Sequence, residues 1–373
     1  MKILHIVPSY KPAYVYGGTI ESIARLCEGL ANAGHEIMVF TTTANGEEEL
    51  DVEPNKEYIV EGVKVIYFER IFKDPFYISP LLSRQLQKEC TSYDIVHIHS
   101  WWNMVVMRAA SICKKKKVKF IISPHGMMSD YILQNSKSFL KWTSFFTFGK
   151  ALLKSSLFHA TSVAEYNECK KLIPKWNGFM IPNIVWLPVL QVSKRKHEEF
   201  IIIFLSRIHP KKGIEILMEA ISKFTHKPLL KIAGSGDENY IKQLKLKAGN
   251  LGITSTIKWL GWQDREEKFS ELMQADLFAL TSFNENFGNV VIEALHAGTP
   301  VVISDKTGLS DFVKEYKLGW ICTTNVDNIQ STLQEAIDAK IARDTISKNA
   351  PLMIKDHFSE EKLIPEYIKQ YQA

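Results

Sequence analysis

Short apolar runs rich in β-branched residues alternate with longer helical stretches along the whole chain. The run Asp94-Ile95-Val96-His97-Ile98-His99 has the pattern of a strand covered on both faces. Such alternation is typical of βαβ units that build parallel sheets, and it argues against a sandwich or a helix bundle. We therefore expect an α/β fold. The predicted strands cover 2–7, 36–42, 63–68, 94–99, 119–123, 157–161, 178–181, 200–205, 229–233, 257–260, 277–281 and 300–304.

The alternation lapses between Pro182 and Glu199, where prolines and a polar run separate two strand signals. A chain of 373 residues has about the length of two domains. We therefore predict two doubly wound, Rossmann-like units that face each other across a ligand-binding cleft. The expected boundaries are 1–183 for an N-terminal domain, 184–199 for a linker, 200–355 for a C-terminal domain and 356–373 for a helix that packs back on the N-terminal domain.

Composition narrows the class of protein further. No run approaches the ~18 apolar residues of a membrane span, and the N-terminus lacks the features of a secretory signal, which predicts a cytoplasmic protein. The five cysteines are scattered, so neither disulfides nor a Cys-x-x-Cys metal site is expected. A net charge of +5 without a binding signature predicts no nucleic-acid partner. Lysines concentrate between 114 and 154, so one face could meet an anionic surface.

The most informative segment, 282–302, follows a predicted strand. A glycine-containing turn leads directly into a helix, so the N–H groups of Gly288, Asn289 and Val290 would form a positive helix N-terminus suited to phosphate. Glu285 precedes this turn and Glu293 lies inside the helix. If the whole span were helical, the two carboxylates would lie about 12 Å apart, too far for a glycosidase pair. We expect them to hold different parts of one long ligand.

This segment resembles the E-x7-E element of the retaining GT-B glycosyltransferases, specifically glycosyltransferase family 4. Other motifs of that family follow in order along nearly the whole chain, and the combination is specific although each motif alone is weak. They are Gly17-Gly18-Thr19-Ile20-Glu21, Ser123-Pro124-His125-Gly126-Met127 and Ser206-Arg207-Ile208-His209-Pro210-Lys211-Lys212-Gly213. One departure is Ile184, where the family usually shows glycine after Pro-Asn. The chain contains no Asp-x-Asp, which agrees with the family's metal-independent chemistry, so we expect no metal and no cofactor.

The resemblance implies a UDP- or GDP-sugar donor, with 1–183 as the Rossmann-like domain that binds the acceptor and 200–355 as the Rossmann-like domain that binds the nucleotide sugar. Loss of the nucleotide diphosphate develops negative charge, which calls for preorganised cations, and Arg207 and Lys212 fit that task. Glu293 would bind the ribose diol, while Glu285 and His125 would contact the sugar. The residues expected in catalysis are His125, Glu285, Arg207 and Lys212; those expected to bind the donor are Gly17, Gly18, Arg207, Lys212, Glu285, Phe287, Gly288, Asn289, Val290 and Glu293.

Each of these residues has an ordinary structural alternative: a solvated surface charge, an exposed helix carboxylate, a helix cap, a tight turn or a lone structural histidine. His97 and His99 have the i, i+2 spacing of a metal-binding pair, but burial in a strand with bonded ring nitrogens is the favoured interpretation. His99 is also a candidate for the border of an acceptor pocket.

The segment 137–154 interleaves lysines with aromatic residues and leucines, and in the family this region faces the acceptor. It could lie in a lipid headgroup region, which leads to the hypothesis of a polyprenyl-diphosphate-linked glycan acceptor and peripheral binding to the inner leaflet. The alternative is that its aromatic residues simply cover the sheet. Trp101 and Trp102 could stack on an acceptor sugar or belong to the core.

The function we expect is a retaining hexosyltransferase that moves a sugar from a nucleotide donor to a glycan or lipid-linked glycan in surface polysaccharide biosynthesis, such as that of lipopolysaccharide. Two alternatives remain open at this point. One is a sugar-nucleotide 2-epimerase of the same fold, and the other is a noncatalytic sugar-nucleotide-binding protein. A dehydrogenase is disfavoured because no Gly-x-Gly-x-x-Gly follows the first strand.

Overall fold

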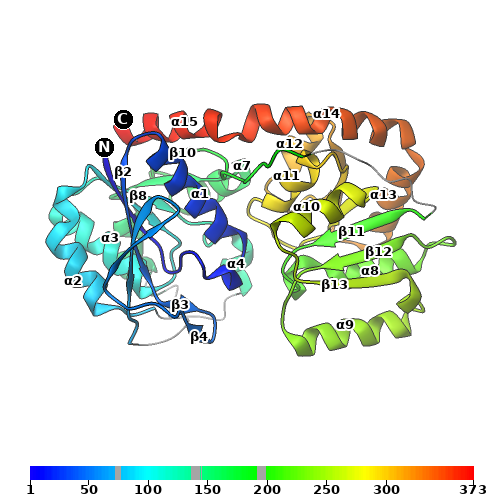
Figure 1. The fold of residues 1–373 in the computed structure, drawn as a ribbon, viewed down its shortest axis with the longest axis horizontal. Helices are drawn as coiled ribbons and strands as arrows, with labels where there is room; N and C mark the ends of the chain where they lie inside the picture. Colours follow the sequence, from blue (N-terminus) through cyan, green and yellow to red (C-terminus); the bar gives the residue numbers. More distant parts are fainter. Residues whose placement is uncertain (72–76, 136–142, 144, 191–198) are drawn as a thin grey trace. The chain divides into compact units, whose positions relative to one another are not determined.

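The computed structural model describes residues 1–71, 77–135, 143, 145–190 and 199–373. These residues form two compact units (Figure 1). Unit 1 comprises Met1–Val185 together with Glu360–Ala373, and unit 2 comprises Trp186–Ser359. Much of the linker expected at 184–199 falls in 191–198, outside the described residues.

Unit 1 is built on an eight-stranded sheet with the order β10-β9-β8-β7-β1-β2-β6-β5, in which only the β5–β6 pair is antiparallel. All seven strands expected in this half are present. The strands are β1 (Lys2–Ile6), β2 (Glu36–Thr42), β5 (Glu57–Val60), β6 (Val63–Phe68), β7 (Ile95–His99), β8 (Phe120–Ser123), β9 (Leu157–Ala160) and β10 (Gly178–Met180), with a separate short pair, β3 (Ala44–Asn45) and β4 (Glu48–Glu49).

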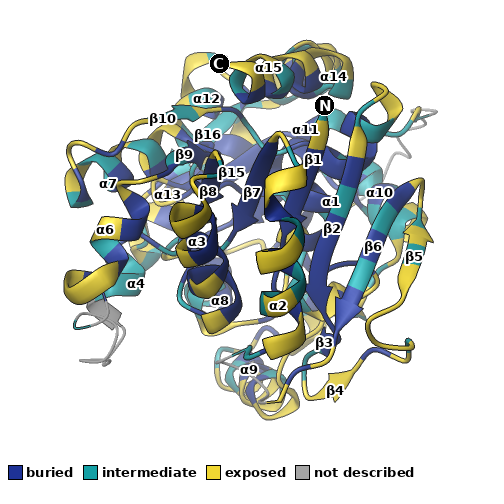
Figure 2. Ribbon diagram, turned by 90° about the vertical axis from the view of Figure 1, so that its left-hand side faces the viewer, coloured by how far each residue is buried: buried dark blue, intermediate teal, exposed yellow. Residues whose placement is uncertain are grey.

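Helices cover both faces of this sheet, and the central strands β1 and β7 are buried between them (Figure 2). Alternate residues of β1 enter different cores: Ile3 packs in the core with residues of α1 and α15, whereas Leu4 packs in the core with residues of α2 and α3. The helices are α1 (Gly18–Asn32), α2 (Pro80–Glu89), α3 (Met104–Lys116), α4 (Asp130–Asn135), α6 (Lys150–Leu153), α7 (Val163–Leu172) and α15 (Glu360–Gln372), with shorter turns at Tyr14–Tyr16, Cys90–Ser92 and Phe145–Gly149.

Unit 2 has a six-stranded parallel sheet with the order β13-β12-β11-β14-β15-β16. The strands are β11 (Ile201–Leu205), β12 (Leu229–Ala233), β13 (Ile257–Gly261), β14 (Leu277–Leu280), β15 (Val301–Ser304) and β16 (Gly319–Cys322). The helices are α8 (Ile214–Ser222), α9 (Glu238–Asn250), α10 (Arg265–Gln274), α11 (Asn289–His296), α12 (Ser310–Glu315), α13 (Val326–Asp338) and α14 (Lys340–Phe358), with short turns at Pro210–Lys212 and Thr254–Thr256.

Local sequence explains several of these boundaries. Asp264 and Glu267 form a capping box at the start of α10, and the Asn325 side chain caps α13. The sequence analysis missed β5 and β16. Both are edge strands in which only Cys322 is buried, so neither carries the long apolar run of a buried strand. Among the described residues, no helix is long and apolar enough to cross a membrane.

A polar network joins α15 to the sheet of unit 1. His159 Nε2 lies 2.8 Å from the carbonyl of Ile181, which can only accept, so this nitrogen carries the proton. In a neutral ring Nδ1 is then an acceptor, and it accepts a hydrogen bond of 2.7 Å from the Ser123 hydroxyl. By the same logic Ser123 accepts from His97 Nε2 at 2.6 Å, and the Tyr371 hydroxyl donates to His97 Nδ1 at 2.7 Å. One carbonyl thus sets the direction of the whole network.

Burial keeps these histidines neutral. It lowers the pKa of His159 to about 4 and that of His5 to about 3, and it holds the pKa values of His97 and His99 well below the ordinary 6.5. Each ring therefore contributes hydrogen bonds rather than charge. In the unfolded chain the same rings titrate near their ordinary value, so folding and proton uptake are linked.

We expect the free energy of unfolding to fall as the pH drops from about 6.5 to about 4. In this window the histidines bind protons in the unfolded chain but not in the folded one. Each of them therefore lowers the free energy of unfolding by about 1.4 kcal/mol for every unit by which the pH falls. Urea unfolding at a series of pH values measures the slope. In His159→Gln the amide N–H can still donate to the Ile181 carbonyl, but one titrating histidine is gone. The slope of the free energy of unfolding against pH should therefore fall by the contribution of one histidine. An unchanged slope would contradict the conclusion that His159 is neutral in the folded protein.

Candidate active site

The predicted catalytic residues of unit 2 follow the carboxyl ends of two neighbouring strands. Arg207 and Lys212 come after β11, and Glu285 comes after β14, which pairs with β11 in parallel. On its other side β11 pairs with β12, so the strand order reverses direction at this point. In open α/β sheets ligands bind beyond the carboxyl ends of the strands at this switch point.

The structure brings Lys212 and Glu285 into direct contact. The Lys212 ammonium donates a hydrogen bond to Glu285 Oε2, and both side chains are largely buried. The backbone of Glu285 is fixed independently: its N–H donates to the Lys306 carbonyl at 2.9 Å and its carbonyl accepts from Gly308 N–H at 2.8 Å. The carboxylate therefore projects from a backbone that is held on both sides.

The loop that carries Lys212 is fastened to the loop after β14. Phe283 N–H donates to the Lys211 carbonyl at 2.9 Å, and the Thr281 hydroxyl donates to the Gly213 carbonyl at 2.8 Å. Gly213 has φ +68°, and a Cβ there would collide with the Thr281 carbonyl oxygen. Only glycine permits this close approach of the two loops.

Glu293 is a buried residue of α11. Its Oε1 accepts a hydrogen bond of 2.7 Å from Lys268 Nζ on α10. The alternative of an exposed helix carboxylate is therefore wrong. Because α11 begins at Asn289, the span from Glu285 to Glu293 is not one helix, and the separation of about 12 Å computed for a continuous helix does not apply.

The start of α11 depends on glycine. Gly288 caps the helix with φ +94°, and a Cβ there would lie 3.2 Å from Thr307 Cγ2 and 3.4 Å from Glu285 Cγ. The N–H groups of Asn289 and Val290 belong to the first turn of α11. The Phe287 side chain is buried near Phe358, so only its backbone is available to a ligand.

Arg207 is exposed and lies in a cationic loop. The pKa of His209 in this loop is lowered, first by burial and then by the positive charges of Arg207, Lys211 and Lys212. An anion placed against this loop would meet a field of several cations.

Sequence reasoning missed two features of this site. Nothing in the spacing of the chain pointed to Lys268 as the partner of Glu293. Gly234 and Gly236, by contrast, directly follow a predicted strand, and a Cβ on either would collide with the carbonyl of Ser206 or Ile208. That Gly-x-Gly pattern after β12 was a readable signal of a close backbone approach beside Arg207.

The predicted residues of unit 1 lie at the carboxyl ends of its strands. Gly17 precedes α1 with φ +86° and ψ −161°, a conformation that glycine alone adopts readily, and Gly18 is the first residue of that helix. His125 follows β8 with φ +51°. Its ring is half-buried, and its Nε2 lies 3.1 Å from His99 Nδ1.

Trp101 is fully buried in the core between the sheet and α3. The core interpretation therefore holds for this residue. Trp102 is half-buried, and its indole N–H donates to the Met127 carbonyl at 2.7 Å.

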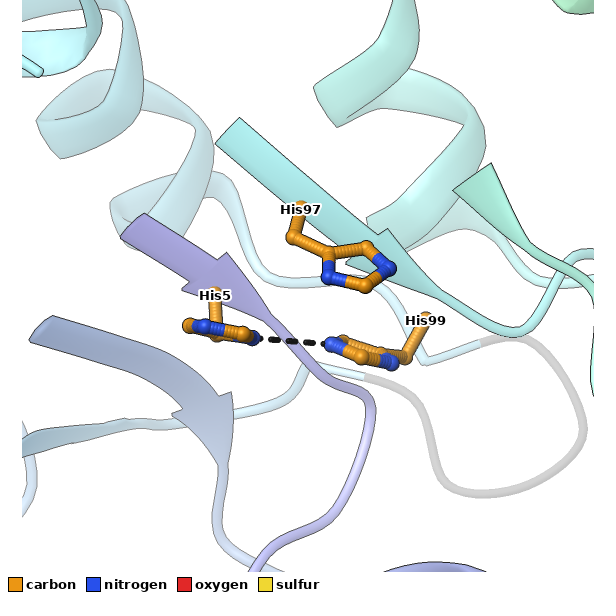
Figure 3. A group of neighbouring side chains, drawn as sticks. All are labelled: His5, His97 and His99. Atoms are coloured by element: carbon orange, nitrogen blue, oxygen red, sulfur yellow. Dashed lines mark hydrogen bonds between the residues drawn. The ribbon is translucent and has the colours of Figure 1, made fainter. Parts of the chain in front are cut away.

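Three buried histidines, His5, His97 and His99, gather above β1 and β7 (Figure 3). One ring nitrogen from each lies within 4.8 Å of the others, so the group has the dimensions of a metal site. His5 Nδ1 and His99 Nε2 are, however, hydrogen-bonded to each other at 2.9 Å, and both nitrogens of His97 are bonded to Ser123 and Tyr371. These contacts favour a hydrogen-bonding role, and a metal ion would have to displace them.

Comparison with known proteins identifies the class. Residues 16–186 match the model "Glycosyltransferase Family 4", and residues 189–353 match "Glycosyl transferases group 1". Together the two models cover most of both units. The chain therefore belongs to the GT-B glycosyltransferases of family 4.

Individual relatives agree with this assignment. The chain is 27% identical to the uncharacterized glycosyltransferase MJ1607 of Methanocaldococcus jannaschii, over 100% of this chain and 98% of that protein. It is similar in structure to Anabaena Alr3699/HepE in complex with UDP and glucose, with a TM-score of 0.78, 19% identity and coverage of 100% and 99%. It is also similar to WaaG, a glycosyltransferase involved in lipopolysaccharide biosynthesis, with a TM-score of 0.69, 15% identity and 98% coverage of each chain.

The close approach of the two loops in unit 2 can be tested with a pair of glycine variants. Gly213→Ala adds a Cβ that collides with the Thr281 carbonyl, whereas Gly252→Ala has a similar φ of +64° and open space around it. Gly252→Ala should lower the free energy of unfolding by about 1 kcal/mol through backbone strain alone. Gly213→Ala should cost at least about 1 kcal/mol more, as measured by urea unfolding. Equal losses would mean that the loops can separate freely.

Proposed function

We propose that this glycosyltransferase takes a sugar from a UDP- or GDP-sugar and transfers it, with retention of configuration and without a divalent metal, to a glycan or lipid-linked glycan acceptor. The product would enter surface polysaccharide biosynthesis. The observation that carries the proposal is the arrangement of charges in unit 2: Lys212 bonded to Glu285, Lys268 bonded to Glu293, and exposed Arg207 in the loop after β11 that leads to Lys212.

The chemistry follows from where charge develops. Cleavage of the bond between sugar and phosphate leaves positive charge on the sugar ring and negative charge on the departing diphosphate. Arg207 and Lys212 stabilise the diphosphate, the first as a planar fork and the second as a point charge. Because Lys212 also touches Glu285, it can link the leaving group to the carboxylate that holds the sugar. Glu293, oriented by Lys268, accepts hydrogen bonds from the ribose diol.

Retention needs no second carboxylate at the reacting carbon if the acceptor hydroxyl attacks from the face that the diphosphate leaves. The departing phosphate oxygen then takes the acceptor proton. His125 contributes a hydrogen bond to the sugar, as the family resemblance implies. HepE, which has the same fold, binds UDP, so UDP is the first nucleotide to test.

Nucleotide binding to the whole chain tests the donor site. A ligand at 100 times its dissociation constant adds about 2.7 kcal/mol to native stability, so UDP or GDP should raise the thermal midpoint. Arg207→Ala should weaken this binding by about 10- to 100-fold, since a charge-assisted hydrogen bond is worth about 1.5–3 kcal/mol. Lys340→Ala, which removes an exposed cation at the start of α14, is the matched control and should bind normally.

Arg207→Ala is preferable to a Glu293 variant, because removal of Glu293 would leave the Lys268 ammonium without its buried partner and lower stability by itself. No midpoint shift with UDP, GDP or ADP would contradict the proposed donor class. Release of free nucleotide from a nucleotide sugar only when acceptor is added separates the transferase from an epimerase and from a binding protein.

We further propose that unit 1 binds an anionic membrane surface near a lipid-linked acceptor. Residues 136–142 and 144 lie outside the described residues, so the argument rests on 145–154. Phe145, Leu152 and Leu153 are buried in the core, as the sheet-covering alternative requires, but Phe146 and Phe148 are 64% and 45% exposed.

Cations lie beside these exposed rings. The Lys114 ammonium, at the end of α3, donates to the Ala151 carbonyl at 3.1 Å, which brings the exposed lysines 114–117 next to α6. Exposed aromatic rings next to a basic run form the combination that anionic headgroups attract.

Cosedimentation with phosphatidylglycerol vesicles at low salt tests this surface. The wild-type protein should sediment with the vesicles and be released as salt is raised. The double variant Phe146→Ala/Phe148→Ala should bind several-fold more weakly. Ile341→Ala in unit 2, at a residue 84% exposed, should leave binding unchanged. A wild-type protein that stays in the supernatant at low salt would rule out membrane binding.

A further inference from the structure

Three histidines of unit 1 form a hydrogen-bonded line that ends at the proposed sugar contact. His5 Nδ1 lies 2.9 Å from His99 Nε2, and His99 Nδ1 lies 3.1 Å from His125 Nε2. The rings of neighbouring members are nearly parallel, at 13° and 15°. Figure 3 shows the buried half of this line, with the bond between His5 and His99 dashed. Neither bond involves His97, whose nitrogens belong to the Ser123 network.

All three rings are neutral at pH 7. Burial lowers the pKa values of His5 and His125 to about 3 and that of His99 well below 6.5. A neutral imidazole has one N–H and one acceptor nitrogen, so the line must run in a single direction. Either His5 donates to His99 and His99 donates to His125, or both bonds are reversed.

The inner end of the line decides between the two directions. His5 Nε2 is buried, and it has no hydrogen-bond partner among the described residues. If the line runs outward from His5, this orphan atom is an unprotonated acceptor. If it runs inward, the orphan is an N–H group, and orphaned buried N–H groups are the rarer and costlier case. The direction in which His5 donates to His99 and His99 donates to His125 is therefore favoured. In this direction the proton of His125 is on Nδ1.

The backbone of His125 is held as well. Its neighbour Gly126 donates its N–H to Glu165 Oε1 at 2.6 Å, and Glu165 is itself buried and accepts from Thr161 N–H at 2.8 Å. Glu165 thus anchors the left-handed backbone at His125, and His99 holds the ring at Nε2. Among the described residues, the side-chain hydrogen bond of His125 is the one at Nε2, so Nδ1 is left for a ligand.

We propose that His99, supported by His5, is a positioning residue that holds His125 in the Nδ1–H tautomer, so that the ring offers a hydrogen-bond donor to a hydroxyl of a sugar bound at unit 1. This inference rests on the proposed function only for the identity of the ligand. The tautomer itself is a property of unit 1, and it exists whether or not a sugar binds there.

The consequence of removing His99 can be stated for a single atom. A neutral histidine without an imposed partner favours the Nε2–H tautomer. In His99→Phe, Nε2 of His125 no longer receives an N–H, so the proton moves to Nε2 and Nδ1 becomes an acceptor. The ring is still present, but at Nδ1 it offers the sugar an acceptor in place of a donor.

Histidine 15N NMR on the whole protein measures this directly, because protonated and unprotonated ring nitrogens have different chemical shifts. The signals of His125 are assigned by their loss in His125→Gln. We expect the wild-type protein to show His125 protonated at Nδ1, and His99→Phe to show it protonated at Nε2. His97→Phe is the matched control: it lies two residues earlier on β7 and is equally buried, but it should leave the His125 tautomer unchanged.

Two outcomes would overturn the inference: a wild-type His125 that carries its proton on Nε2, or an unchanged tautomer in folded His99→Phe. The wild-type spectrum decides the direction of the line even if the variant does not fold. A correct tautomer in a protein that binds no nucleotide would instead count against the proposed function, so the two failures are distinguishable.

Discussion

Parallel pairing of β11 with β14 is the constraint on which the proposed donor site depends. It places the ends of two strands side by side and so allows Lys212 and Glu285, 73 residues apart in sequence, to share a hydrogen bond. The backbone bonds between Phe283 and Lys211 and the glycine at 213 then fix the distance between the loops. Neither charged side chain could be held in this way by its own loop, because loops without such contacts are mobile.

The ion pairs of the site are poorly explained by stability. Lys212 and Glu285 are only 15% and 18% exposed, and Lys268 and Glu293 only 20% and 11%. The free-energy cost of removing these charges from water offsets most of their electrostatic attraction. Apolar side chains of similar size would therefore stabilise the fold as well or better. The proposed function gives these ion pairs another role, because charges fixed before reaction need no reorganisation when charge develops.

The sequence predicted what is local and missed what depends on distant partners. Buried strands such as β7 and β14 were found because each has its own apolar run, and the start of α11 was found because Gly288 sits between a strand and a helix. The edge strands β5 and β16 lacked that run. Lys268 could not be recognised, because its role exists only once α10 packs beside α11. Burial of Glu293 and Trp101 likewise follows from packing, not from neighbours in sequence.

The buried histidines of unit 1 also depend on partners that are distant in sequence. From the sequence, His97 and His99 were two alternate residues of one strand, with burial favoured over metal binding but with no indication of their hydrogen-bond partners. The parallel register sets His5 opposite His97 and His99 opposite Ser123, so these side chains lie on one face of the sheet. Desolvation there removes their charge and makes each ring a donor at one nitrogen and an acceptor at the other. Two strand neighbours thereby enter different networks: His97 joins the one that reaches α15, and His99 joins the one that reaches His125.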